Sequence, residues 1–243
     1  MIKAAATCIA MVVVAGCGTG LDHPEPPAVT IFAAASLQPP FDQIARHTPV
    51  TSRFNYAGTQ TLTAQLTQGA QADVFASADQ DHMSQVVKAG LVTGSPTVFA
   101  HNRLEIAVAK GNPKRINGLE DLARKDLVVV LADPSVPAGK YAQQILTKAG
   151  VSVHPASLEP QVTGVLSKVT LGEADAGIVY VSDIKTSGKV DGVEIPDSQN
   201  VIADYSIAIL NSGTHEGAAA TFVGLVLSST GQSILEAAGF EKA

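Results

Sequence analysis

The chain has 243 residues and a formal net charge of -6, and 46% of its residues are hydrophobic. That much apolar surface can offset the entropy of the chain, which excludes an intrinsically disordered protein. The acidic balance, without any cluster of Lys or Arg, argues against nucleic-acid binding, and the absence of tryptophan argues against an aromatic stacking platform.

The first 28 residues indicate an export signal followed by a membrane tether. The mostly apolar run over 4–15 is shorter than the roughly 20 residues needed to span a bilayer and is typical of a secretory signal peptide. Residues 14–17, Val-Ala-Gly-Cys, resemble a bacterial lipobox, in which cleavage precedes the cysteine. We therefore expect a signal peptide over 1–16, a lipidated Cys17, and a Gly/Pro-rich tether over 17–28 that anchors the protein to the outer side of the cell membrane. An ordinary signal peptide with an incidental cysteine is the alternative.

From residue 29 onward, short apolar runs alternate with segments of helical spacing. In chain order, the pattern predicts a strand over 29–34, a helix through Phe41 and Ile44, a strand over 50–56, a helix from Gly58, a strand over 73–76, a helix capped by Asp79, a strand over 104–109, a helix over 119–124, a strand over 127–131, a helix ending near Gly150, a helix over 162–171, strands over 176–181 and 202–210, and helices over 217–227 and 230–238.

This alternation predicts an α/β protein with largely parallel sheets. It restarts after the strand over 104–109, which indicates two lobes with a ligand cleft between them. We expect lobe 1 to comprise 29–103 and 211–243. Lobe 2 would comprise 104–210, including hinge strands around 104–109 and 204–210.

Four places share one chemical character, because each offers a hydroxyl or unpaired N–H groups where a helix begins. They are Ser36, Thr59, residues 137–139 and residues 161–164. Several helix N-termini aimed at one point can bind an anion without any Lys or Arg. Ser and Thr at helix starts also serve simply as caps, at about 1 kcal/mol each, so position alone does not decide between the two roles.

Four segments resemble the periplasmic molybdate-binding proteins of bacterial ABC transporters. They are AAASL over 33–37, ADVFASADQ over 72–80, DPSVPAGKY over 133–141 and GIVYVSD over 177–183. The resemblance covers about 29–240 and implies the two-lobed type II periplasmic-binding-protein fold. In that family a tetrahedral oxyanion is held only by neutral donors.

Carried over by position, the resemblance implies five ligand-binding residues: Ser36 through its hydroxyl and backbone, Thr59 through its hydroxyl, Ala138 and Val162 through backbone N–H groups, and Tyr180 through its phenol. The family carries a serine where this chain has Thr59, so Gly58 or Thr61 is an alternative for that contact. Molybdenum would be held only as molybdate, without direct metal ligands.

The resemblance further implies a lipoprotein that captures molybdate, and tungstate, and delivers it to the permease and ATPase of an ABC transporter. It implies no enzymatic activity, no cofactor, no nucleic-acid partner and a monomer. Molybdate is a dianion that only accepts hydrogen bonds, whereas hydrogen phosphate must also place a proton against an acceptor. The same fold binding sulfate, phosphate or another small anion is the alternative, and for sulfate only the size of the cavity can discriminate.

Two further alternatives are weaker. Residues 182–185 match the S-x-x-K motif and 185–188 loosely match K-T-G, both found in penicilloyl serine enzymes. The two overlap on Lys185, whereas that chemistry takes them from distant segments. The effector domain of a transcription regulator is disfavoured by the export signal.

Overall fold

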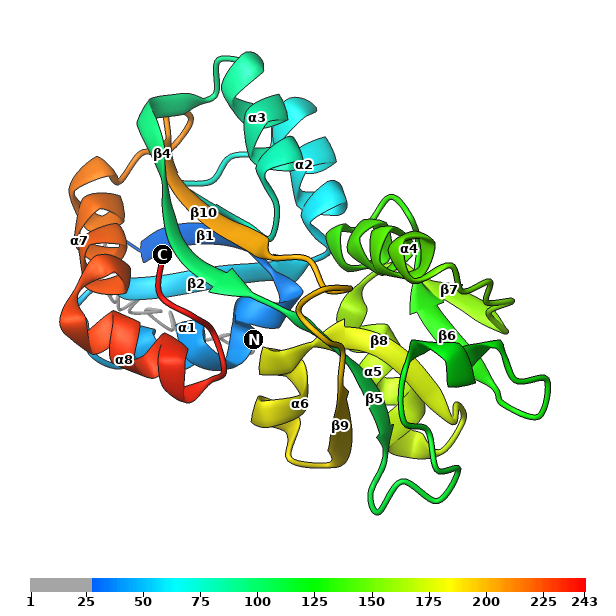
Figure 1. Ribbon diagram of the computed structural model, residues 1–243. Helices are drawn as coiled ribbons and strands as arrows, with labels where there is room; N and C mark the ends of the chain where they lie inside the picture. The colour runs from blue at the N-terminus through cyan, green and yellow to red at the C-terminus, as the bar shows by residue number, and fades with distance from the viewer. Residues whose placement is uncertain (1–27) are drawn as a thin grey trace, which may run out of the picture.

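A computed structural model describes residues 28–243 (Figure 1). The predicted signal peptide, Cys17 and nearly all of the tether therefore lie outside the described residues. The strands are β1 Ala28–Ala34, β2 Thr51–Ala57, β3 Val74–Ser77, β4 Val92–Asn102, β5 Leu104–Ala109, β6 Val129–Ala132, β7 Ser157–Glu159, β8 Ala176–Tyr180, β9 Val190–Glu194 and β10 Ala203–Leu210. The helices are α1 Gln38–Ala45, α2 Thr59–Thr67, α3 Gln80–Lys88, α4 Pro137–Ala149, α5 Val162–Leu171, α6 Val181–Ser187, α7 Glu216–Leu227 and α8 Ser229–Ala237, with short 3-10 turns at η1 Ala35–Leu37 and η2 Leu119–Ala123.

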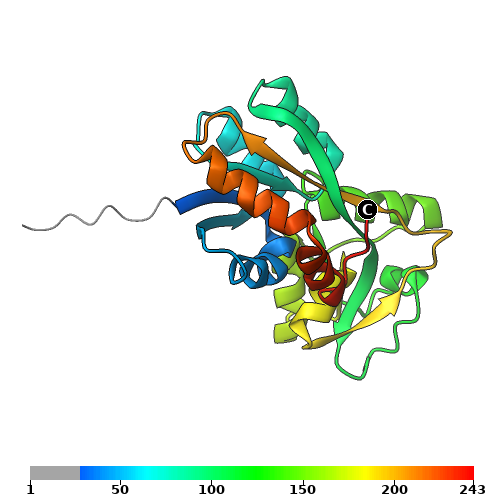
Figure 2. The same ribbon diagram turned by 90° about the vertical axis from the view of Figure 1, so that its left-hand side faces the viewer.

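The first lobe is built on a five-stranded sheet in the order β2-β1-β3-β10-β4. Strand β1 pairs in parallel with β2 and β3, and β10 runs antiparallel to β3 and β4. Both faces of the sheet are covered, by α1, α7 and α8 on one side and by α2 and α3 on the other (Figures 1 and 2). A central parallel strand buried on both faces needs a continuous apolar run, and β1, AVTIFAA, supplies one.

Each face of this sheet has its own packing. On one side the ring of Phe41 in α1 lies 5.9 Å from that of Phe99 in β4 and 5.4 Å from that of Phe222 in α7, centroid to centroid. On the other side, Leu62 and Met83 from α2 and α3 cover the sheet. These layers hold the carboxyl ends of β1 and β2 in place at the edge that faces the second lobe.

The second lobe repeats the plan with a five-stranded sheet in the order β7-β6-β8-β5-β9. Strand β6 pairs in parallel with β7 and β8, while β5 runs antiparallel to β8 and β9. The chain crosses between the lobes twice, from β4 into β5 at Arg103 and from β9 to β10 over 195–202 (Figure 1). The predicted α/β class and the two-lobed arrangement are both present.

The strand at the end of the second crossing lies in a different lobe from the one expected. The sequence pattern predicts that 104–210 belongs to lobe 2, but β10 pairs with β3 and β4 of the first sheet. The reason is that β10 completes the first sheet between two strands and buries Tyr205 and Ile207 there. A strand's partner depends on long-range packing, which periodicity along the chain does not reveal.

Four elements were not predicted: β4, β7, α6 and β9. Strand β4 is an edge strand whose first half, with Gly94 and Pro96, is largely exposed, so it has the composition of a loop. Among residues 28–243, no single helix is long and apolar enough to cross a membrane, and α7 and α8 reach that length only as a pair bent by 59°.

Candidate functional site

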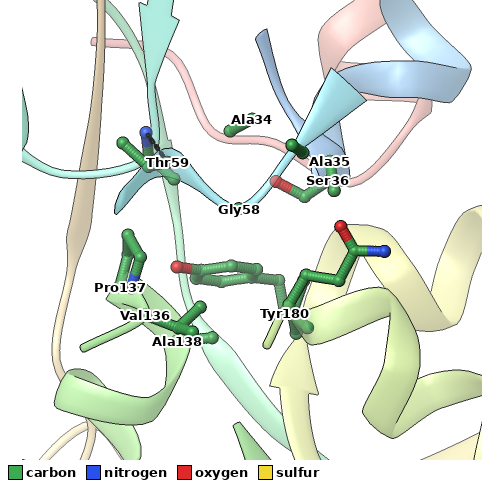
Figure 3. A pocket seen from close by; sticks show the side chains of 13 residues that line it. Ala34, Ala35, Ser36, Gly58, Thr59, Val136, Pro137, Ala138 and Tyr180 are labelled. Carbon is green, nitrogen blue, oxygen red and sulfur yellow. Dashed lines mark hydrogen bonds between the residues drawn. The ribbon is translucent and has the colours of Figure 1, made fainter. Parts of the chain in front are cut away.

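The five predicted ligand residues line one cavity between the two lobes (Figure 3). Ser36 and Thr59 follow the carboxyl ends of β1 and β2 in the first lobe, and Ala138 and Val162 follow those of β6 and β7 in the second. Tyr180 is the last residue of β8. All five therefore stand at the carboxyl ends of parallel strands, the edge where open α/β sheets bind ligands.

The cavity is small and its lining carries no charge among the described residues. The cavity has a volume of about 20 Å³. This is slightly more than the roughly 10–15 Å³ that one water requires on the same measure, so the space suits a single small ion. The lining consists of Ala34, Ala35, Ser36, Ala57, Gly58, Thr59 and Ala78 from the first lobe and Val136, Pro137, Ala138, Gln161, Val162 and Tyr180 from the second.

Tyr180 has the most distinctive environment of the five. Its side chain is 1% exposed, and its hydroxyl has no hydrogen-bond partner among residues 28–243. The hydroxyl points into the space between Thr59 and Pro137 (Figure 3). Burial raises the pKa of Tyr180 well above its ordinary value, so the phenol keeps its hydrogen. A buried donor without a partner costs about 1–3 kcal/mol, which a ligand oxygen here would recover.

The two hydroxyl side chains of the first lobe are already hydrogen-bonded on one side. The backbone N–H of Ala78 donates to Oγ1 of Thr59 at 3.3 Å, which leaves the hydroxyl hydrogen of Thr59 free to point into the cavity. Oγ of Ser36 lies 2.9 Å from the hydroxyl of Tyr205 in β10, and both residues are buried. Ser36 lies inside η1 and Thr59 is the first residue of α2, while the N-cap residues of η1, α1 and α2 are Ala34, Leu37 and Gly58, so neither hydroxyl occupies a capping position.

Sequence reasoning missed Tyr205. It lies within an eight-residue strand, ADYSIAIL, in which a tyrosine is indistinguishable from an ordinary core residue. Only the fold brings it to Ser36, which is 169 positions away in the chain. No local signal could have identified this pair.

The two backbone donors of the second lobe stand in the first turns of α4 and α5, where N–H groups have no partner in a preceding turn. Pro137 occupies the first position of α4, and Gly139 allows the turn before it to close. A Cβ on Gly139 would lie 2.1 Å from the backbone oxygen of Asp133. The helix dipoles of α4 and α5 add a partial positive charge at this end.

Two carboxylates in loops beside the cavity are committed to their own partners. Asp133 accepts from the hydroxyl and N–H of Ser135, as expected for a loop cap, and these bonds lower its pKa. Glu159 pairs with Lys168 at 2.6 Å, which lowers its pKa below the ordinary value. An acceptor for a protonated ligand is therefore not presented by either group.

Contacts across the mouth of the cavity join the two lobes. Nε2 of Gln60 donates to the backbone oxygen of Pro160 at 2.8 Å, and the ammonium of Lys140 pairs with Asp81 of the opposite lobe. The backbones of the two lobes also approach closely at Gly58, since a Cβ there would lie 2.8 Å from the backbone oxygen of Pro160. The lobes are in a closed arrangement.

The residues of the S-x-x-K motif are engaged elsewhere. Oγ of Ser182 accepts from Nδ2 of Asn102 at 2.8 Å, and Nζ of Lys185 donates to the backbone oxygen of Glu236 at 3.2 Å. Within the described chain, no group of three or more His, Cys, Asp or Glu residues is placed to hold a metal ion.

Comparison with known proteins agrees with this geometry. A profile described as bacterial extracellular solute-binding protein matches residues 29–241. The chain belongs to this family. It is 45% identical to the molybdate-binding protein ModA of Mycobacterium tuberculosis H37Rv over 221 residues, which covers 88% of this chain and 85% of ModA. The predicted resemblance to the molybdate-binding proteins is thereby confirmed.

Two solved structures share the fold. The periplasmic molybdate-binding protein of Azotobacter vinelandii has a TM-score of 0.78 at 21% identity, covering 88% of this chain and 99% of that one. The sulfate-binding protein SubI of Mycobacterium tuberculosis H37Rv also has a TM-score of 0.78, at 20% identity, covering 89% of this chain and 87% of that one. Both likenesses show that the chain shares this fold.

Proposed function

We propose that this protein binds molybdate, and tungstate about equally well, in the cavity between its lobes. The observation that carries the proposal is the buried hydroxyl of Tyr180, which has no hydrogen-bond partner among residues 28–243 and faces a cavity lined by neutral groups from both lobes. Ser36, Thr59, Ala138 and Val162 would supply the remaining donors. The 45% identity to a protein named for molybdate binding supports the choice of ligand.

The donor set suits an ion that accepts hydrogen bonds and donates none. A hydrogen-bearing oxyanion such as hydrogen phosphate would leave its proton against a donor, at a cost of about 1–3 kcal/mol for an unmatched buried group. No carboxylate among the described residues lines the cavity, and Asp133 and Glu159 in the adjoining loops are occupied by Ser135 and Lys168. Sulfate has the same charge as molybdate, so its exclusion depends on a cavity too wide for its shorter bonds.

Uncharged donors also suit a delivery protein. Because two of them belong to the first lobe and three to the second, parting of the lobes separates them and releases the ion, without breaking an ion pair to Lys or Arg. We propose that the ligand shifts the equilibrium toward the closed arrangement and that the permease and ATPase of an ABC transporter receive the released ion.

For the segment ahead of the described residues, we propose that Cys17 carries the lipid anchor and that the mature protein is a monomer held at the outer face of the cell membrane. Multiple acyl chains, at ~0.8 kcal/mol per buried CH₂, would give stable attachment. Replacing Cys17 by Ser should move the protein from the membrane fraction to the soluble fraction. Retention of Cys17→Ser in the membrane fraction contradicts the anchor but leaves the ligand proposal intact.

Thermal unfolding with a panel of molybdate, tungstate, sulfate and phosphate tests the ligand. At about 100 times its dissociation constant a ligand adds about 2.7 kcal/mol to stability, which corresponds to a rise of about 5–10 °C for a protein of this size. We expect that rise for molybdate and tungstate only. An equal rise with sulfate favours the alternative ligand, and no rise with any anion contradicts an oxyanion site.

Two substitutions in α2 provide a matched pair for the same experiment. Thr59→Val removes the hydroxyl that faces the cavity and should weaken molybdate binding about tenfold or more, the scale of a hydrogen bond to a charged group. Thr67→Val removes an exposed hydroxyl that bonds only within the helix, to the carbonyls of Thr63 and Ala64, and should leave binding unchanged. Equal effects of the two variants would remove Thr59 from the site.

A further inference from the structure

We propose that Tyr205 is a positioning residue that makes Ser36 a hydrogen-bond donor to the bound oxyanion and thereby contributes to selectivity against oxyanions that carry a hydrogen. This inference rests on the proposed function. It assigns a role to a residue outside the cavity lining, through its bond to Ser36.

The number of hydrogens limits the direction of the bond between Ser36 and Tyr205. A serine hydroxyl has one hydrogen and accepts through its lone pairs. Oγ of Ser36 and the hydroxyl of Tyr205 lie 2.9 Å apart, so one of them donates to the other. If Ser36 donated to Tyr205, it would turn a lone pair toward the cavity and repel a dianion. If Tyr205 donates, the hydrogen of Ser36 is free for the ligand.

The phenol of Tyr205 is well suited to remain the donor. Burial raises its pKa well above the ordinary value, so it keeps its hydrogen at any physiological pH. Its side chain is fully buried, which keeps water from competing for the bond. Thr59 has the same arrangement, since it accepts from the N–H of Ala78 and keeps its own hydrogen for the cavity. Each hydroxyl donor of the first lobe is thus oriented by a hydrogen bond that it accepts on the side away from the cavity.

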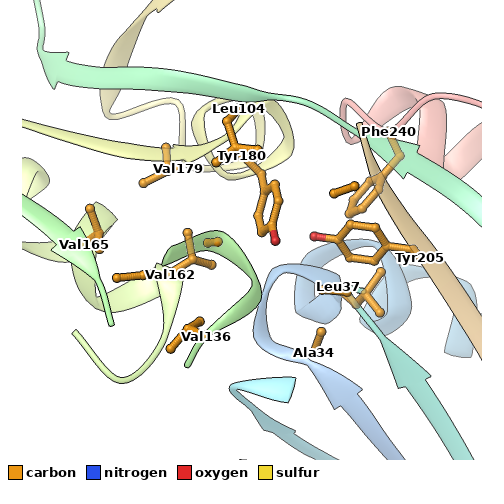
Figure 4. Close-up of a cluster of buried hydrophobic side chains, with 14 of the residues drawn as sticks. Ala34, Leu37, Leu104, Val136, Val162, Val165, Val179, Tyr180, Tyr205 and Phe240 are labelled. Carbon is orange, nitrogen blue, oxygen red and sulfur yellow. The ribbon is translucent and has the colours of Figure 1, made fainter. Parts of the chain in front are cut away.

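The position of Tyr205 is determined by its surroundings rather than by its bond to Ser36. Its ring packs edge-on against Phe240, Phe99 and Tyr180, with centroid distances of 5.1, 6.4 and 5.7 Å. In Figure 4 the ring of Tyr205, from the first lobe, lies beside that of Tyr180, from the second. The pairing of β10 with β4 shifts register directly after Tyr205, the kind of irregularity that redirects a side chain.

The test is Tyr205→Phe, which removes the hydroxyl and keeps the ring. Binding of molybdate and of hydrogen arsenate is measured by calorimetry at mildly alkaline pH, where arsenate is a tetrahedral dianion that carries one hydrogen. We expect Tyr205→Phe to weaken molybdate binding about 3- to 10-fold. Binding of hydrogen arsenate should be unchanged or stronger, because Ser36 can then rotate and accept from that ligand. A general loss of structure would weaken the binding of both ions equally.

A double-mutant cycle with Ser36→Ala isolates the coupling. Once Ser36 lacks its hydroxyl, Tyr205→Phe should change molybdate affinity by less than about twofold. The matched control is Tyr56→Phe, which removes a phenol hydrogen-bonded to Asp42 at 2.8 Å, outside the cavity lining, and should not alter the ratio of the two affinities.

The outcomes separate the two proposals. Suppose that the unmodified protein binds molybdate. If Tyr205→Phe then weakens the binding of molybdate and of hydrogen arsenate equally, or if it has its full effect in the Ser36→Ala background, the positioning role is overturned and the proposed function stands. If the unmodified protein does not bind molybdate, both proposals fail. The inference is supported if Tyr205→Phe lowers the ratio of molybdate affinity to hydrogen arsenate affinity when Ser36 is present and not when Ser36 is replaced by Ala.

Discussion

Replacing Tyr180 by Phe should change the stability of the free protein and its ligand affinity in opposite directions. The substitution keeps the ring, which is 1% exposed and packs 5.7 Å from that of Tyr205. It removes only a hydroxyl that has no hydrogen-bond partner among residues 28–243. In the absence of ligand, the folded state therefore loses no described hydrogen bond and is relieved of a buried unsatisfied group.

The magnitudes follow from these contacts. An unsatisfied buried polar group costs about 1–3 kcal/mol, so the free energy of unfolding of ligand-free Tyr180→Phe should equal or exceed that of the unmodified protein. A hydrogen bond to a charged ligand contributes about 1.5–3 kcal/mol, so the dissociation constant for molybdate should rise roughly 10- to 150-fold. Urea unfolding without ligand and calorimetric titration with molybdate measure the two quantities.

Tyr56→Phe should show the reverse pattern. Its hydroxyl donates to Oδ1 of Asp42 at 2.8 Å and lies outside the cavity lining. That variant should lose about 1 kcal/mol of unfolding free energy and keep the affinity for molybdate. If Tyr180→Phe instead destabilises the free protein and binds molybdate as tightly as before, Tyr180 is an ordinary core residue and not a ligand donor.

Three further predictions concern the turn, the cleft and a buried acid. Gly139→Ala should cost about 1–3 kcal/mol of unfolding free energy, because its Cβ would meet backbone oxygens at 2.1 and 2.5 Å, whereas Gly217→Ala, with no atom within 4 Å, should be neutral in the same urea titration. Lys140→Gln removes the exposed pair with Asp81 across the lobes and should change molybdate affinity by at most about 1 kcal/mol at low salt, a difference that should vanish at high salt. Burial raises the pKa of Asp183 to about 7; the folded chain then binds a proton that the unfolded chain releases, so stability should fall as pH rises from about 4 through about 7. Asp183→Asn should therefore raise the melting temperature at about pH 8 and not at about pH 5, and equal effects at both would show that Asp183 does not titrate there.

Much of the site could be predicted because its donors follow local rules. Ser36 and Thr59 stand where a helix begins after a strand, and Ala138 and Val162 lie in the first turns of α4 and α5. Free N–H groups at these places follow from helix geometry within a few residues. The strands β1, β6 and β8, beside Ser36, Ala138 and Tyr180, are apolar runs, whereas β7, which precedes Val162, was not predicted. The convergence of these places follows from a second rule, that the carboxyl ends of parallel strands share one edge.

The tertiary structure alone decided which distant residues support the donors. Tyr205 reaches Ser36 only because β10 joins the first sheet, and the sequence analysis had assigned that strand to the second lobe. Lys140 meets Asp81 because the fold brings α4 of the second lobe beside α3 of the first. Hydrophobic periodicity reports which residues are buried and not which strand lies beside them, since pairing is set by the packing of the whole core. The local pattern therefore predicts the donors, and long-range packing determines how their hydrogens are oriented.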